Sequence, residues 1–126
     1  MKSLKLEYLI DSPPYSVWKA LTDPKVIVEW GAGPAKMSEK ENSEFSLWGG
    51  DIHGKITKVI LSRELRQDWY GGDWDNPSKV VFKLTEKNGK TLVELSQTDI
   101  PASEFDDIED GWERYYLGEI KKLLEK

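Results

Sequence analysis

The chain has 126 residues, a length typical of one domain with one hydrophobic core, so we expect a single domain over residues 1–126. Its 23 acidic and 18 basic side chains give a net charge of −5, and no basic cluster interrupts them, which argues against nucleic-acid binding. It has no cysteine, which excludes disulfides and thiolate chemistry and fits a cytoplasmic location, and no apolar run approaches the roughly 20 residues of a membrane span.

The first part of the chain predicts a strand followed by two short helices. Residues 4–10 alternate apolar and polar side chains, which is the period of a half-buried strand. Ser12 can cap a helix whose first turn tolerates proline. Thr22 or Asp23, followed by Pro24, repeats this start signal, so a second short helix that ends at Trp30 should follow at an angle to the first.

After the helix-breaking residues 31–34, the sequence predicts a series of strands. Two weak strands are expected around residues 35–40 and 44–48, with a polar turn between them. Four stronger strands follow, in which apolar and polar residues alternate, around residues 52–60, 65–69, 80–84 and 93–97. An Asn-Gly pair predicts a hairpin turn at residues 87–89. Together with the first strand, these segments make an antiparallel sheet of about seven strands.

Residues 103–124 predict one long C-terminal helix. Its apolar positions recur with helical spacing and comprise Phe105, Ile108, Trp112, Tyr116, Ile120 and Leu123. An antiparallel sheet needs a cover over its apolar face, and this helix is the only large element available for it. The expected class is therefore α+β, with the helix across the concave face of a curved sheet and some space left between the two.

The sequence Gly-Gly-Asp occurs twice, at residues 49–51 and 71–73. The glycine spacing does not fit a dinucleotide-binding loop, and a strand rather than a helix follows the first pair. We therefore interpret both as turns or bulges that use positive φ angles. The only histidine, His53, falls on the strand face opposite Ile52 and Ile56, which indicates a surface residue. With no cysteine present, the sequence predicts no metal site and no cofactor.

Three residues of the C-terminal helix do not fit a simple amphipathic pattern. Gly111 and Gly118 each weaken a helix by about 1 kcal/mol relative to alanine. We attribute them to close approach of the helix to a sheet edge or to the two short helices, with room for a ligand as the alternative. Glu119 falls among apolar positions. It either lies at the edge of that face and pairs with Lys122, or anchors a polar group inside a cavity.

Five pieces of the sequence resemble a known family in order over nearly the whole chain. They are "SPPYSVWKALTDP", Trp30, "FSLWGGDIHGKI", "TDIP" and "GWERYYLGEIKKLL". Together they resemble the domain shared by the C-terminal part of the activator of the heat shock protein 90 ATPase and its stand-alone prokaryotic relatives. The resemblance implies the helix-grip fold of the birch-pollen allergen and START-like superfamily, in which a cavity between sheet and long helix often holds hydrophobic ligands.

Three functions are open on these grounds. The first is non-enzymatic binding of a small hydrophobic or aromatic ligand. The alternative is a protein-binding module associated with a chaperone, which ranks second because the Asn-rich motif of the eukaryotic co-chaperone's N-terminal domain has no match in these residues. The third is an enzyme of the cyclase or hydrolase kind, for which Glu119, Tyr116 and Asp68 are the available acid–base groups.

The expected binding residues follow from the helical spacing of the C-terminal segment and from the alternation of the strands. Helical spacing places Trp112, Tyr116 and Glu119 on the inner face of the helix, and alternation places Trp69 and Phe82 on the facing side of the sheet. Trp30 is expected near one end. Apolar walls would then supply most of the affinity, while Glu119 and the Tyr116 hydroxyl orient the ligand.

Overall fold

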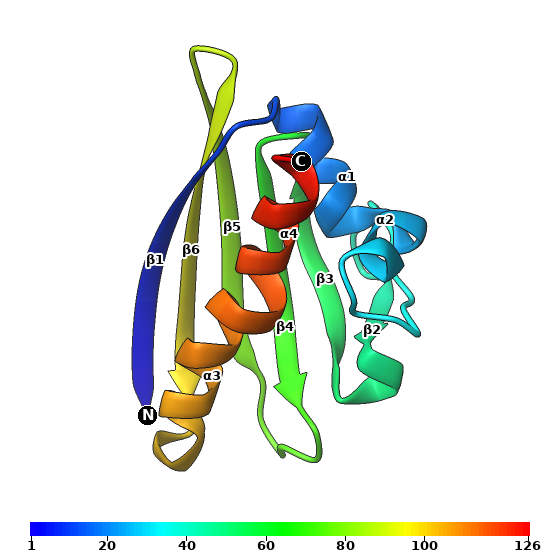
Figure 1. Ribbon diagram of the computed structural model, residues 1–126. Helices are drawn as coiled ribbons and strands as arrows, with labels where there is room; N and C mark the ends of the chain where they lie inside the picture. Colours follow the sequence, from blue (N-terminus) through cyan, green and yellow to red (C-terminus); the bar gives the residue numbers. More distant parts are fainter.

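In a computed structural model of residues 1–126, six antiparallel strands form one curved sheet in the order β1-β6-β5-β4-β3-β2 (Figure 1). The strands are β1 (Lys2–Ile10), β2 (Glu44–Leu47), β3 (Ile52–Ile60), β4 (Glu64–Gly71), β5 (Ser78–Lys87) and β6 (Lys90–Ile100). Strands β2 to β6 pair in sequence order, and β1 then pairs with β6 at the other edge. This arrangement confirms the predicted α+β helix-grip class.

Two short helices, α1 (Pro14–Thr22) and α2 (Pro24–Glu29), follow β1 as predicted. The Asp23 side chain accepts a hydrogen bond from the Lys25 amide, at 2.9 Å, and so caps α2. The start of α1 differs from the prediction, because Pro13 occupies the N-cap position and no side chain caps this end. Pro13 and Pro14 have no amide hydrogen, so the start of α1 has fewer donors that need a cap.

The sheet has six strands rather than about seven because residues 35–40 pair with β2 at one position only. Lys36 and Ser46 exchange two backbone hydrogen bonds, of 2.8 and 2.9 Å, in an isolated bridge. Beyond it the chain turns, and the Ser43 hydroxyl lies 2.9 Å from that of Ser38 and donates to the Lys40 carbonyl at 2.6 Å. These local serine bonds compete with a strand ladder, so pairing stops.

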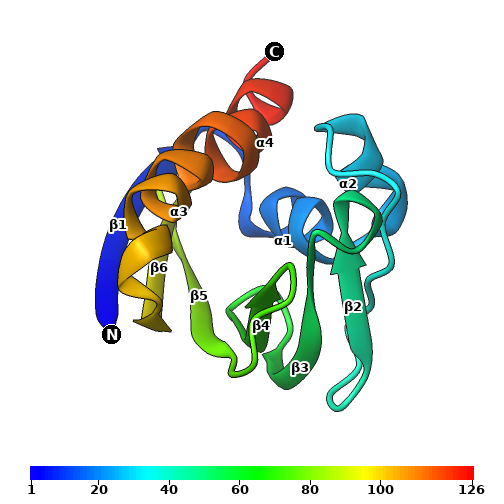
Figure 2. The same ribbon diagram turned by 90° about the horizontal axis from the view of Figure 1, so that it is seen from below.

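The C-terminal helix crosses the concave face of the sheet, with α1 and α2 beside it (Figures 1 and 2). It is not one regular helix. A short 3-10 turn, η2 (Ala102–Glu104), leads into α3 (Phe105–Gly111), a π-helical turn, η3 (Trp112–Tyr116), and α4 (Leu117–Leu124). None of the helices is long and apolar enough to cross a membrane. The π turn inserts one extra residue per turn, so the side chains after it are rotated relative to a continuous α-helix.

The hydrophobic core lies between the concave face and these helices. Its fully buried members include Val17, Leu21, Ile27, Ile56, Leu65, Val80, Phe82, Leu95, Leu117 and Ile120. They come from both short helices, from the four central strands and from the C-terminal helix. The helices and the sheet therefore bury one another's apolar faces, as the layer arrangement requires.

Gly118 is required by the π turn. A Cβ atom built on Gly118 would lie 1.8 Å from the carbonyl oxygen of Glu113, in the same helix. Gly118 is in close contact, as predicted, but with the backbone of its own helix. The predicted neighbours, a sheet edge or the two short helices, are wrong. A Cβ atom on Gly111 would meet no atom within 4 Å. The predicted close approach is therefore wrong for Gly111, which borders open space, as in the alternative.

This contrast gives a matched pair of substitutions. Gly118→Ala should lower the free energy of unfolding by about 1–3 kcal/mol, because the new methyl group forces the π turn apart. Gly111→Ala should instead raise it by about 0.5–1 kcal/mol, because alanine favours the helix and nothing obstructs its methyl group. Urea denaturation of both variants measures the difference, and equal effects of the two substitutions would contradict the assigned role of the π turn.

Candidate functional site

The structure brings five of the six predicted site residues into one aromatic cluster. The Trp112 ring centroid lies 5.7 Å from the centroids of both Trp69 and Phe82. Tyr116 lies 4.5 Å from Trp112 and 4.8 Å from Trp30. All five side chains are at most 3% exposed. The helix therefore carries two aromatic residues that interleave with aromatic residues of the sheet and of the α2 end, as the periods predicted.

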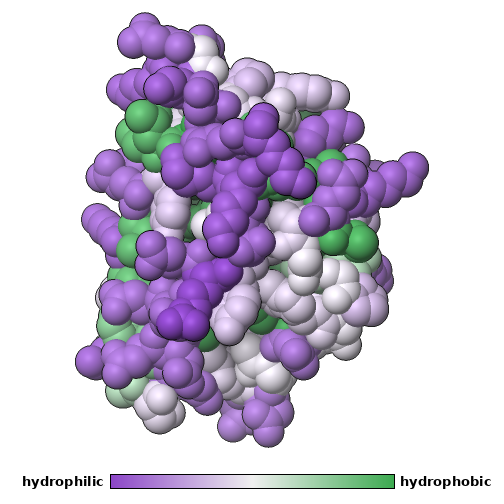
Figure 3. Space-filling view, viewed as in Figure 1, coloured by the Kyte–Doolittle hydropathy of each residue, from purple (hydrophilic) through white to green (hydrophobic).

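A cleft of about 310 Å³ opens on one side of this cluster. One wall comes from α3 and η3, the other from η1 (Trp48–Gly50) and the residues after it, and Trp69 of β4 also contributes. The ten lining residues are Trp48, Asp51, Ile52, Trp69, Asp107, Ile108, Gly111, Trp112, Tyr115 and Tyr116. In the space-filling view, strongly hydrophilic side chains cover the outer side of the helix, and a paler area lies beside its lower half (Figure 3).

The predicted residues divide into three groups. Trp69, Trp112 and Tyr116 line the cleft. Trp30 and Phe82 are buried behind the lining, against Tyr116, at 4.8 and 6.0 Å. Glu119 does not line the cleft. Its carboxylate lies 3.3 Å from the Lys122 amine and its side chain is 35% exposed, so the pairing alternative is the one that the structure shows.

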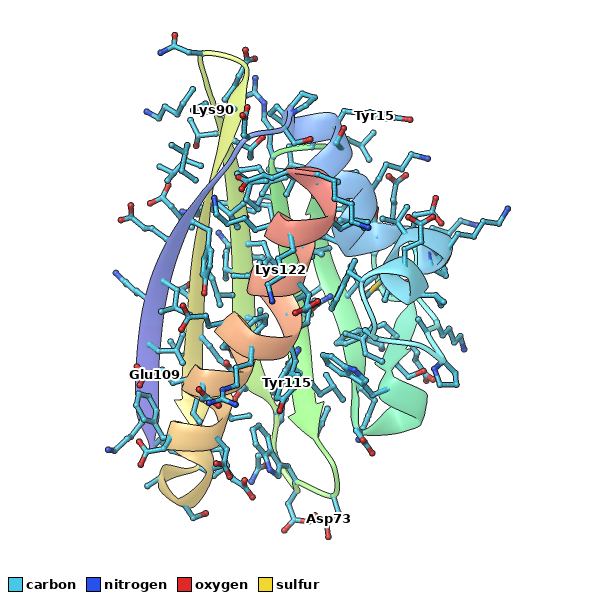
Figure 4. The ribbon with its side chains drawn as sticks, in the orientation of Figure 1. Tyr15, Asp73, Lys90, Glu109, Tyr115 and Lys122 are labelled. Carbon is cyan, nitrogen blue, oxygen red and sulfur yellow. The ribbon has the colours of Figure 1, made fainter.

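Several lining residues, above all Trp48 and Tyr115, are not among those that the sequence predicted. Tyr115 lies next to Tyr116 in the π turn, and both line the cleft, although the Tyr115 side chain is 59% exposed. Figure 4 shows Tyr115 on the side of the helix that faces β4, with Glu109 on the opposite side towards β1. The amphipathic period does not reveal a π turn, so no sequence signal separated Tyr115 from the exposed face.

Trp48 is held in the cleft wall by the turn that follows β2. Its backbone amide donates to the Ala32 carbonyl at 2.8 Å, and its indole N–H donates to the Gly31 carbonyl at 3.0 Å. Trp48, Gly49 and Gly50 all have positive φ angles, of 50°, 68° and 109°. The first Gly-Gly-Asp is therefore a turn, as predicted, and it presents the preceding tryptophan to the cleft. In the second, Gly72 has a positive φ angle of 55°.

Buried polar atoms lie among the aromatic rings. The Trp112 indole N–H donates to the Gln97 side-chain oxygen at 2.8 Å. Gln97 in β6 and Gln67 in β4 flank Val80 in one row across the sheet. Gln97 Nε2, Gln67 Oε1 and Trp69 Nε1 are buried and have no partner in the protein. Such unpaired groups are uncommon in protein interiors, which marks this region as a candidate for interaction with a ligand or ordered water.

His53 lies away from the cleft. It pairs with Tyr70 across β3 and β4, and because Tyr70 follows Trp69, the two rings are on the other face of the sheet. Their centroids are 5.2 Å apart and the rings are parallel within 2°, and His53 Nε2 lies 2.8 Å from the Gly72 carbonyl. No cluster of three or more histidine, cysteine or acidic side chains in the chain could hold a metal ion.

Comparison with known proteins identifies the family to which the chain belongs. The family model described as "Activator of Hsp90 ATPase homolog 1-like protein" matches residues 11–125. The chain belongs to this family. A Mus musculus relative named activator of 90 kDa heat shock protein ATPase homolog 1 is 24% identical over 113 residues, which are 88% of this chain and 33% of the relative.

Other members of the activator family show the same extent of similarity. A Dictyostelium discoideum relative with the corresponding activator name is 28% identical over 123 residues, 95% of this chain and 32% of its own. This chain thus spans about a third of the length of these curated relatives. The crystal structure of an HSP90 activator from Plasmodium falciparum has the same fold, with a TM-score of 0.91 and 24% identity over 98% of this chain and 96% of that one.

Because Tyr116 is buried, we expect the free energy of unfolding of this family member to fall at alkaline pH. Burial raises the pKa of the Tyr116 phenol above its usual value, because the phenolate is poorly solvated there. The unfolded chain releases this proton near pH 10, whereas the folded chain keeps it. The free energy of unfolding should therefore be unaffected below about pH 10 and fall above it, by up to about 1.4 kcal/mol per pH unit for this residue.

Tyr116→Phe should remove that contribution, and Tyr15→Phe serves as the control because Tyr15 is 64% exposed. The measurement is urea denaturation of the three proteins at several values between pH 9 and pH 11. If the free energy of unfolding falls equally with pH in the wild-type protein and in Tyr116→Phe, the phenol is not buried as described.

Proposed function

We propose that this protein binds a small, mainly apolar aromatic ligand in the cleft between α3–η3 and η1. The observation that carries the proposal is the lining itself: seven of its ten residues are hydrophobic, and five of the ten are the aromatic residues Trp48, Trp69, Trp112, Tyr115 and Tyr116. A volume of about 310 Å³ lies at the lower end of the range typical of small-molecule sites. A ligand of two or three fused rings is of suitable size.

The aromatic walls supply both affinity and shape. Flat rings gain from offset or edge-to-face contact with tryptophan and tyrosine beyond the area that they bury. Trp112 and Tyr116 are already fixed by their neighbours in the cluster, and Trp48 is fixed by two hydrogen bonds to the loop before β2. A ligand therefore meets a largely preformed surface, and little side-chain freedom is lost when it binds.

The acid–base groups of the enzyme hypothesis are not assembled at the cleft. Glu119 pairs with Lys122 outside it. Asp68 lies in β4 on the face opposite Trp69, with its carboxylate 3.4 Å from the Lys79 amine. Tyr116 lines the cleft, and burial raises the pKa of its phenol. The carboxylates that do line the cleft, Asp51 and Asp107, are exposed and come from opposite walls, so the three expected acid–base groups do not converge there. This arrangement favours binding over a cyclase or hydrolase mechanism.

Gly111 allows the cleft to be blocked without disturbing the core. It lines the cleft, has ordinary helical angles, and a side chain built on it enters open space. Gly111→Leu should therefore fill part of the cleft, while Gly111→Ala adds a single methyl group in the same place. We expect Gly111→Leu to weaken binding of N-phenyl-1-naphthylamine by at least about tenfold, whereas Gly111→Ala weakens it by less than about threefold.

The measurement is the fluorescence of N-phenyl-1-naphthylamine, a neutral dye whose emission rises in apolar sites, titrated with each protein. Native mass spectrometry and solvent extraction of the wild-type protein from its host then identify any bound compound. The proposal fails if the dye does not bind the wild-type protein, or if it binds all three proteins equally well.

A second candidate function is association with an Hsp90-type chaperone. It is supported by the names of the curated relatives and by the Plasmodium falciparum HSP90 activator, of which the shared fold covers 96%. We expect addition of the protein to raise the ATPase rate of an Hsp90 from the same organism in a saturable manner. An Hsp90-specific inhibitor measures the background rate, and an unrelated acidic protein is the control.

The result that counts against this candidate is an unchanged ATPase rate together with no complex in analytical ultracentrifugation at micromolar concentrations. Testing Gly111→Leu in the same assay separates the two functions. Loss of dye binding with unchanged stimulation of the chaperone would show that they use different surfaces.

A further inference from the structure

We infer that the cleft selects aromatic ligands that carry no negative charge and that present an oxygen as hydrogen-bond acceptor. This inference rests on the proposed ligand-binding function and specifies the chemistry of its ligand. Two independent observations carry it: the charges of the residues that line the cleft, and the unpaired, buried indole N–H of Trp69, which is one of these residues.

The charged residues of the lining are all acidic. Asp51 and Asp107 are exposed and come from opposite walls, Asp51 from the turn after η1 and Asp107 from α3. No lysine, arginine or histidine lines the cleft. An anionic ligand would therefore meet two carboxylates and no compensating cation, and this repulsion discriminates against it.

The other acidic residues of α3 and the π turn lie away from the cleft. Asp106, Glu109, Asp110 and Glu113 line a separate hollow together with Glu7 and Tyr8 of β1. Two basic side chains lie beside them, Arg114 at 3.0 Å from Asp110 and Lys2 over the Phe105 ring at 4.9 Å. The repulsion of an anionic ligand therefore comes mainly from Asp51 and Asp107.

The hydrogen-bond donor is found by comparing the three tryptophans of the lining. The Trp48 indole N–H donates to the Gly31 carbonyl, and the Trp112 indole N–H donates to Gln97. The Trp69 indole N–H is buried and has no acceptor in the protein. An indole N–H can only donate, and leaving it unpaired in the interior is unfavourable. Trp69 lines the cleft but its N–H has no exposed surface, so a ligand oxygen that supplies the missing acceptor must displace a neighbouring side chain to reach it.

The two observations together favour a neutral carbonyl or ether oxygen on an aromatic ring system. A carboxylate also accepts hydrogen bonds but is repelled by Asp51 and Asp107, and a plain hydrocarbon leaves the Trp69 donor unpaired. Three probes of nearly equal shape separate these cases: 2-acetylnaphthalene is a neutral acceptor, 2-naphthoate is an anionic acceptor, and 2-ethylnaphthalene has no acceptor.

The experiment measures dissociation constants of the three probes by equilibrium dialysis and compares ratios between proteins, so that differences in probe solubility cancel. In Trp69→Phe, the affinity for 2-acetylnaphthalene relative to 2-ethylnaphthalene should fall about fivefold, because only the ketone uses the indole N–H. In the double variant D51N/D107N, the affinity for 2-naphthoate relative to 2-acetylnaphthalene should rise about fivefold. Added salt should raise the same ratio in the wild-type protein.

A second readout does not depend on the folding of Trp69→Phe. In the wild-type protein, the infrared carbonyl band of bound 2-acetylnaphthalene should lie at lower frequency than the band of the same ketone in an apolar solvent, where it has no hydrogen bond. The inference is overturned if the probes bind but the ratios do not change in the variants, or if 2-naphthoate binds the wild-type protein more tightly than the ketone. If none of the three probes binds, both the proposed ligand-binding function and this inference fail.

Discussion

The indole of Trp112 joins the C-terminal helix to the sheet, and the rest of the site is arranged around it. It stacks on Trp69 of β4, contacts the edge of Phe82 of β5, and donates a hydrogen bond to Gln97 of β6. A single side chain is thereby held by three neighbouring strands. Because an indole N–H left unpaired in this interior is costly, the bond to Gln97 also fixes the direction in which the ring lies. The position of the helix, and with it one wall of the cleft, follows from these contacts.

The π turn that carries Trp112 accounts for the two halves of the site. All three aromatic residues of η3 line the cleft, and of these Trp112 and Tyr116 are also buried in the core whereas Tyr115 is exposed. The return to α-helix at Leu117 brings the Glu113 carbonyl so close to Gly118 that a side chain there is excluded. Directly before the π turn, Gly111 leaves open space beside the cleft. The irregular helix thus packs tightly against its own backbone at one glycine and leaves room for a ligand at the other.

Much of this architecture was predictable from the sequence because local periods report which face of an element is buried. Alternation identified the strands and placed Trp69 and Phe82 on the inner face, and helical spacing placed Trp112 and Tyr116 opposite them. Helical spacing also placed Glu119 on the apolar face, whereas the structure has it at the edge, paired with Lys122. The spacing assumes a continuous α-helix, and the π turn breaks that assumption just before this residue. Trp48 escaped prediction because its place in the wall depends on a turn with positive φ angles.

The central claim is that the cleft beside Trp112 is the place where a ligand binds, and the six tryptophans of the chain allow it to be tested in one titration. Each indole N–H gives its own signal in a two-dimensional ¹H–¹⁵N NMR spectrum, assigned by single Trp→Phe substitutions. On addition of 2-acetylnaphthalene, we expect the signals of Trp48, Trp69 and Trp112 to shift, while that of Trp18, whose indole N–H donates to Glu39 away from the cleft, stays in place. Shifts centred on Trp18, or no shift at any of the six indoles at saturating probe, would contradict the account.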